Sequence, residues 1–149
     1  MVRVLGWGGI ANTNGARSFA SKTLVVTKDM VVEIQLSNLS ADADEECGGV
    51  FRLVDTSNFL AAYVDDGDNL VHLSKFEAGV ETSIATAAWT AADTAELRVI
   101  CQGSRIRVWV DRKLVIDATD STFLAETKAG LFSRSTAVVL YENFYAQAI

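Results

Sequence analysis

The sequence predicts an all-β protein in which two antiparallel sheets pack face to face. Apolar and polar residues alternate along many short segments, and this period of two is typical of strands with one buried face. Turn residues separate these segments at intervals of roughly 8–12 residues, and no convincing amphipathic helix is present. About a dozen strands favour two packed sheets over one open sheet, so we predict a jelly-roll β-sandwich.

The first predicted strands follow from alternation and from turn residues. Residues 30–37 alternate Met, Val, Ile and Leu with Val, Glu, Gln and Ser, and an acidic loop at 42–46 ends the strand. Strands at 48–54 and 59–64 form a hairpin, because the Asp, Ser and Asn side chains at 55–58 can hydrogen-bond to their own backbone in a tight turn.

Later strands are separated by turns rich in Asp and Gly. The alanine-rich stretch 85–95 is interpreted as a loop joining the sheets rather than as a helical turn. Strands are predicted at 70–76, 80–87, 95–101, 129–133 and 137–146.

The clearest hairpin lies between Gly103 and Asp120. From 105 to 110, Ile and Val alternate with two Arg and one Trp, a turn follows at Asp111 and Arg112, and Leu114 and Ile116 resume the pattern. One face of this hairpin is therefore buried and the other is exposed. The inward positions predict a core that includes Ile34, Leu97, Val99, Ile106, Val108 and Ile116.

Composition predicts one domain over residues 1–149, since the chain has 149 residues of which 50% are hydrophobic. The net charge of −6 repels phosphate backbones, so we expect no nucleic-acid partner. No apolar run is long enough for a bilayer span, and the start of the chain lacks a signal-peptide core, so we expect neither membrane insertion nor the usual secretory route. Cys47 and Cys101 are interpreted as buried free thiols, with a disulfide as the alternative.

Several segments resemble the concanavalin A-like lectin/glucanase jelly rolls, the laminin G-like group. The hairpin from Gly103 to Thr122 carries the resemblance best. The other similar segments are 14–18, 31–34, 48–52 with Asp55, Asn58 and Phe59, 69–79, 95–99, 129–132 and 141–144. The resemblance implies a sandwich fold, and family members include lectin-like binding modules, glycoside-hydrolase relatives and surface domains of bacteriophage virions.

The hydrolases of this family place three carboxylates on one strand in the pattern Glu-x-Asp-x-x-Glu. The nearest match in this chain is Glu33, Gln35 and Asn38, and the amides at the last two positions can neither donate a catalytic proton nor act as nucleophile. We therefore predict that the protein is not an enzyme. The single histidine, His72, is interpreted as a half-exposed strand residue rather than a general base.

Arg52, His72, Arg107 and Trp109 fall on the polar phase of their strands, which suggests one solvent-facing sheet surface. An exposed tryptophan beside arginines can stack on sugar rings and hold hydroxyl groups, so these residues are the candidate glycan surface. The alternative is that a loop or a neighbouring subunit covers Trp109.

Asp65, Asp66 and Asp68 could offer oxygen ligands to calcium, but they lack the spacing of an EF-hand loop. A plain turn is favoured, so no cofactor is predicted.

These observations favour a non-catalytic surface module of a larger assembly, namely a phage capsid-decoration or tail attachment protein at the virion surface that could also adhere to a cell-surface glycan. Its expected partners are copies of itself, as a homo-oligomer, or a capsid or tail protein. The alternatives are a free extracellular carbohydrate-binding module of lectin type and, last, a glycoside hydrolase relative.

Overall fold

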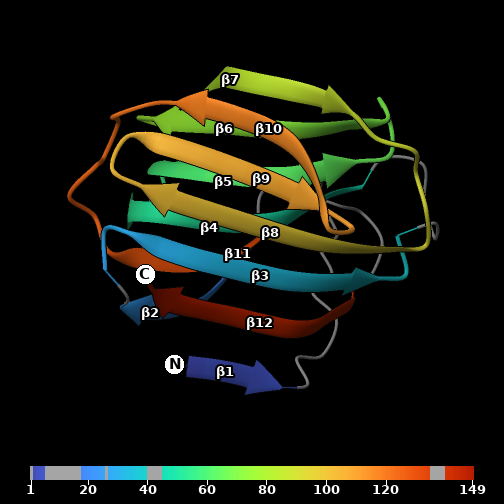
Figure 1. Ribbon diagram of the computed structural model, residues 1–149, viewed down its shortest axis with the longest axis horizontal. Helices are drawn as coiled ribbons and strands as arrows, with labels where there is room; N and C mark the ends of the chain where they lie inside the picture. Colours follow the sequence, from blue (N-terminus) through green and yellow to red (C-terminus); the bar gives the residue numbers. More distant parts are fainter. Residues whose placement is uncertain (1, 6–17, 26, 40–44, 135–139) are drawn as a thin grey trace.

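Two antiparallel sheets stack face to face in the computed structural model of the chain, which describes residues 2–5, 18–25, 27–39, 45–134 and 140–149 (Figure 1). Twelve strands and no helix occur within these ranges, so no described helix could span a bilayer. The strands are β1 (Val2–Leu5), β2 (Ser18–Val25), β3 (Met30–Ser37), β4 (Glu46–Asp55), β5 (Asn58–Asp65), β6 (Leu70–Glu77), β7 (Val80–Ala88), β8 (Thr94–Gln102), β9 (Arg105–Val110), β10 (Lys113–Thr119), β11 (Lys128–Arg134) and β12 (Leu140–Ala148).

Each sheet has six strands. The front sheet, nearer the viewer in Figure 1, has the order β1-β12-β3-β8-β9-β10, and the back sheet has the order β2-β11-β4-β5-β6-β7. The all-β sandwich is thus confirmed, and the predicted strands match β3 to β11 closely. The structure describes the last predicted strand from residue 140 onward, and it adds β2, where Ser, Lys and Thr interrupt the apolar alternation.

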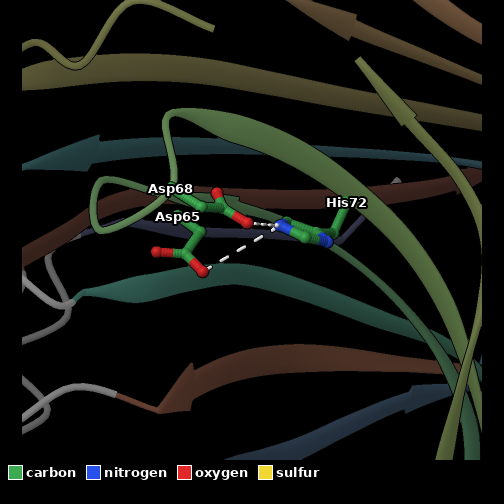
Figure 2. Close-up of side chains that lie close together, drawn as sticks. All are labelled: Asp65, Asp68 and His72. Carbon is green, nitrogen blue, oxygen red and sulfur yellow. Dashed lines mark hydrogen bonds and ion pairs between the residues drawn. The ribbon is translucent and has the colours of Figure 1, made fainter. Parts of the chain in front are cut away.

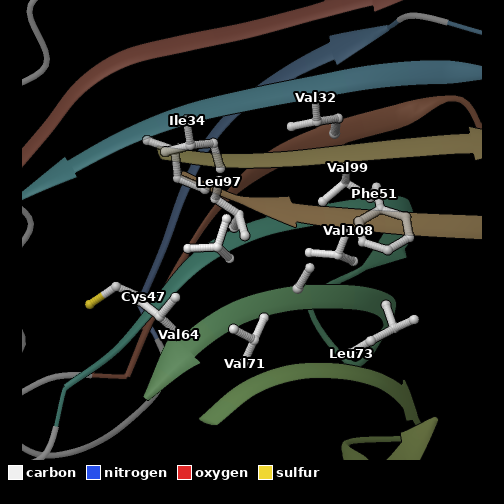
Figure 3. Packing of buried hydrophobic residues seen from close by; sticks show 14 of the residues in the cluster. Val32, Ile34, Cys47, Phe51, Val64, Val71, Leu73, Leu97, Val99 and Val108 are labelled. Atoms are coloured by element: carbon white, nitrogen blue, oxygen red, sulfur yellow. The ribbon is translucent and has the colours of Figure 1, made fainter. Parts of the chain in front are cut away.

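The main core lies between the sheets and contains all six core residues predicted from the sequence. Each of them is at most 4% exposed. Figure 3 labels four of them, Ile34, Leu97, Val99 and Val108. Ile34 of β3 reaches the backbone of β4 at Gly49, since a Cβ built on that glycine would lie 2.6 Å from Ile34 Cδ1. A side chain at position 49 would therefore have to displace the tip of the Ile34 side chain.

The back sheet is buried on both faces in its centre. Along β4 and β5 nearly every residue is buried, whereas the sequence analysis placed Arg52 of β4 on a solvent-facing surface. A second cluster lies on the face away from the main core, because its members alternate with core residues along the strands. It consists of Val50, Leu53, Phe59, Ala61, Tyr63, Phe76 and Phe132.

Gly48 allows the aromatic rings of this second cluster to meet across β4. Its Cα partners are Tyr63 on β5 and Phe132 on β11, and their ring centroids lie 5.1 Å apart. A Cβ at Gly48 would lie 2.0 Å from the carbonyl oxygen of Ala62, so any larger residue would displace β5. Phe59 and Phe76 stack beside them at 4.4 Å.

Both cysteines are buried free thiols, as expected. Burial raises the pKa of the Cys101 thiol to about 12 and raises the pKa of Cys47 further. Neither thiol is therefore a reactive thiolate near neutral pH.

We expect Ile106→Ala to lower the free energy of unfolding by about 2–4 kcal/mol, because the residue is fully buried and truncation leaves a cavity between the sheets. Urea denaturation followed by circular dichroism measures this. Val80→Ala, at a side chain that is 66% exposed, is the control and should change it by less than about 0.5 kcal/mol. Equal effects of the two changes would contradict this placement of the core.

Candidate functional site

A row of side chains crosses the outer face of the front sheet on four adjacent strands. Tyr145 on β12 is the Cα partner of Glu33 on β3, Glu33 of Arg98 on β8, and Arg98 of Trp109 on β9. Directly opposed residues of antiparallel strands point to the same side, so all four belong to one face. We call these four residues the aromatic row. Their neighbours in sequence, such as Ile34 and Leu97, point into the core.

A second row lies beside the first. Asn143, Gln35 and Glu96 are Cα partners on β12, β3 and β8. Together with part of the aromatic row they line a groove of about 400 Å³, within the usual range for ligand sites. The full lining is Glu33, Ile34, Gln35, Glu96, Arg98, Asn143, Tyr145 and Gln147.

A smaller hollow continues the groove toward Trp109. It measures about 110 Å³ and is lined by Glu96, Arg98, Trp109 and Arg112. Because Glu96 and Arg98 line both spaces, the groove and the hollow form one surface, with Tyr145 in the lining of the groove and Trp109 in that of the hollow.

The groove floor is polar, and its side chains are paired with one another. Glu33 and Arg98 form an ion pair of 2.7 Å while remaining 37% and 48% exposed. The amide of Asn143 donates to Gln35 Oε1. A guanidinium carries five donors and a carboxylate several acceptor sites, so each pair keeps capacity for the hydroxyl groups of a ligand.

Arg107 holds the Trp109 ring from one side. Its guanidinium carbon lies 5.5 Å from the ring centroid and its NH2 group donates to Gln102. This cation–π contact orients the ring on the outer face. Trp109 and Arg107 therefore do share an outer sheet face, whereas the other two residues of the predicted surface lie elsewhere.

Arg52 is buried, and its predicted place on a solvent-facing surface is wrong. The pairing of β4 with β5 shifts after Phe51, and Arg52 adopts a positive φ of 47° in this irregularity. Its side chain donates to the carbonyls of Asp120 at 2.7 Å and Gly103 at 2.6 Å, which ties β4 to two loops of the front sheet. The residue is an internal anchor, since a bulge re-aimed a side chain that regular alternation would have exposed.

His72 lies on the back sheet, separate from Trp109, and stacks on the Tyr63 ring at 4.8 Å. Its Nε2 is 2.8 Å from Asp68 Oδ2 and 3.9 Å from Asp65 Oδ2 (Figure 2). The predicted turn is confirmed, because Asp65 and Asp68 each accept a backbone N–H through Oδ1, from Gly67 and Leu70.

The aspartates predicted as weak calcium ligands do not form one all-oxygen set. Asp66 accepts the backbone N–H of Glu45 at 2.6 Å, while the atoms that could meet a cation come from Asp65, Asp68 and His72. Calcium takes six to eight oxygen ligands, and two carboxylates with an imidazole match that requirement poorly.

A charged group that the sequence analysis missed lies on the outer face of the back sheet. Arg134 NH2 is 2.8 Å from Glu46 Oε1 and 3.2 Å from Glu81 Oε2, and Tyr63 donates to Glu81 at 2.5 Å. Burial raises the pKa of Glu46. Burial also acts to raise that of Glu81, but hydrogen bonds, chiefly from Tyr63, outweigh it and lower this pKa. One guanidinium therefore bridges both carboxylates.

No protein-family model matches the chain, and no curated protein matches it in sequence. Solved structures do match. The carbohydrate binding module CBM66 from Bacillus subtilis superposes with a TM-score of 0.64 at 23% identity, over 98% of this chain and 92% of that chain. Sheep galectin-11, in complex with glycerol, gives 0.64 at 14% identity, over 84% and 94%.

The GH43 protein BlXynB from Bacillus licheniformis superposes with a TM-score of 0.62 at 14% identity, over 82% of this chain but 28% of that chain. This chain thus corresponds to little more than a quarter of that protein. Together these likenesses show that the chain has the concanavalin A-like jelly-roll fold, as the sequence resemblance implied.

We expect Arg52→Ala to lower the free energy of unfolding by at least about 2 kcal/mol, because the fully buried side chain leaves a cavity and the carbonyls of Asp120 and Gly103 lose their charged donor. Arg52→Lys should not restore stability, since a single ammonium cannot replace a fork that reaches two carbonyls. Thermal and urea unfolding measure both variants, with Arg112→Ala as an exposed arginine control. Wild-type stability of Arg52→Ala would contradict the anchoring role.

Proposed function

We propose that this chain is a non-catalytic carbohydrate-binding module whose ligand lies in the groove of the front sheet. The observation that carries the proposal is the aromatic row, in which Tyr145 and Trp109 flank an exposed polar floor on neighbouring strands. Aromatic faces pack against the apolar faces of sugar rings, and the floor offers donors and acceptors to their hydroxyl groups.

Two features support binding without catalysis. Gln35 stands in the groove, where the hydrolase pattern has a carboxylate, and Asn38 lies beyond the end of β3 with a positive φ of 63°. Glu33, the carboxylate that remains, is paired with Arg98. The matches to the structures titled as a carbohydrate binding module and as a galectin extend over 92% and 94% of those chains, which also favours a binding role.

As part of the same proposal, the module acts in many copies on a larger body, such as a phage head or tail at the virion surface. An open groove with an exposed floor favours weak binding at each site, and fixing several copies together raises the overall avidity by orders of magnitude. A free extracellular lectin is the alternative, for which binding to a soluble ligand must be tight at a single site.

We expect Trp109→Ala and Tyr145→Ala each to weaken glycan binding at least about tenfold, because each removes a ring from one end of the groove. A glycan array, followed by affinity electrophoresis in gels containing xylan, mannan or β-glucan, measures binding. Val80→Ala on the back sheet is the control for an exposed apolar change. Retention of wild-type binding in both aromatic variants, with unchanged melting temperatures, would place the ligand elsewhere.

The assembly proposal predicts that the purified protein self-associates or binds to particles of its native source. Light scattering of the purified protein reports its oligomeric state, and cryo-electron microscopy of the source shows whether copies occupy a particle surface. A protein that is strictly monomeric, absent from particles and able to bind one sugar with high affinity would overturn the assembly proposal and favour the free lectin.

A further inference from the structure

The two rings of the aromatic row are far apart compared with one sugar. Tyr145 and Trp109 lie on strands separated by three strand spacings, which at about 4.8 Å each places their Cα atoms about 14 Å apart. A single pyranose cannot contact both rings at once. A ligand that contacts both must be a chain of sugars lying across the strands.

We infer that the groove binds an internal stretch of a neutral linear polysaccharide, at least three linked sugar rings long, rather than a single terminal sugar. This inference rests on the proposed function and specifies its ligand. Tyr145 and Trp109 stack on two non-adjacent rings of the chain, and the ring between them lies over Glu33 and Arg98.

The surface continues past Trp109, as binding within a long chain requires. The next Cα partner in the row is Leu114 on β10. Its side chain is 45% exposed, so no wall of packed residues closes the surface at this position. The floor is also open, since both members of the Glu33 and Arg98 ion pair remain accessible. A pocket for one terminal sugar would instead enclose most of its ligand.

The charges of the groove indicate that the chain is neutral. Glu33 and Glu96 contribute two negative charges, and Arg98 and Arg112 contribute two positive charges. The lining residues therefore balance, Arg107 beside Trp109 adds one positive charge, and the net charge of −6 on the whole chain repels a polyanionic glycan. Carboxylate, guanidinium and amide groups in two parallel rows suit the hydroxyl groups along both edges of a neutral chain.

Isothermal titration calorimetry with xylo-, cello- and manno-oligosaccharide ladders, from monosaccharide to hexasaccharide, tests this inference. In a ladder that binds, affinity should rise at least about tenfold between the disaccharide and the tetrasaccharide and then level off, because both rings become engaged. Trp109→Ala should bring the hexasaccharide affinity down to that of the disaccharide. Trp109→Phe, which keeps a ring, should restore a large part of the gain.

The possible results separate this inference from the proposed function. Equal affinity for monosaccharide and hexasaccharide, or tighter binding of heparin than of every neutral ladder, would overturn the inference while glycan binding stands. Failure to bind any ladder, any polysaccharide gel and any arrayed glycan would overturn both. Tyr145→Ala is a second variant that should also remove the gain with chain length, and Val80→Ala controls for stability.

Discussion

Ile34 packs against the bare backbone at Gly49 in the core between the two sheets, so the direction of this side chain sets which residues of β3 face outward. With Ile34 turned inward on β3, its neighbours Glu33 and Gln35 must point outward, and a shift of pairing by one residue would bury both. The same register carries the alternation across β12, β8 and β9, so that inward apolar residues and outward polar residues form separate rows. The groove is therefore a consequence of the packing that holds the sandwich together.

The strands of this fold could be predicted because alternation is a local property of the sequence. In the 103–120 hairpin, Ile106, Val108 and Ile116 are recognisable as inward residues from their immediate neighbours. Leu114, which the alternation places with them, is instead 45% exposed, because the pairing of β10 with β9 shifts between Leu114 and Ile116. The order of strands is not local, since β12 pairs with β3 across more than a hundred residues and loop lengths do not determine that pairing. Tyr145, Asn143 and Arg98 fall within predicted strands, but nothing in the sequence placed them beside Glu33.

The predictions from sequence that failed at the candidate site did so for particular physical reasons. Arg52 follows the polar phase of its strand, yet the irregular pairing after Phe51 and a positive φ turn it inward, toward the carbonyls of Asp120 and Gly103. His72 also follows the polar phase, but the outer face of the back sheet carries a second buried cluster, and the histidine stacks on Tyr63. Trp109 was placed correctly because β9 is regular and the outer face of the front sheet is accessible.

The two sheets therefore differ in how many of their residues the fold constrains. The back sheet is constrained on both faces at its centre, by glycines that allow close approach and by aromatic rings that meet across them. On the front sheet, the outer residues are exposed pairs such as Glu33 with Arg98, and pairs of this kind contribute at most about 1 kcal/mol to stability. Side chains that the fold does not need can be replaced without unfolding it, so the outer face of the front sheet is where ligand recognition and stability can be separated by mutation.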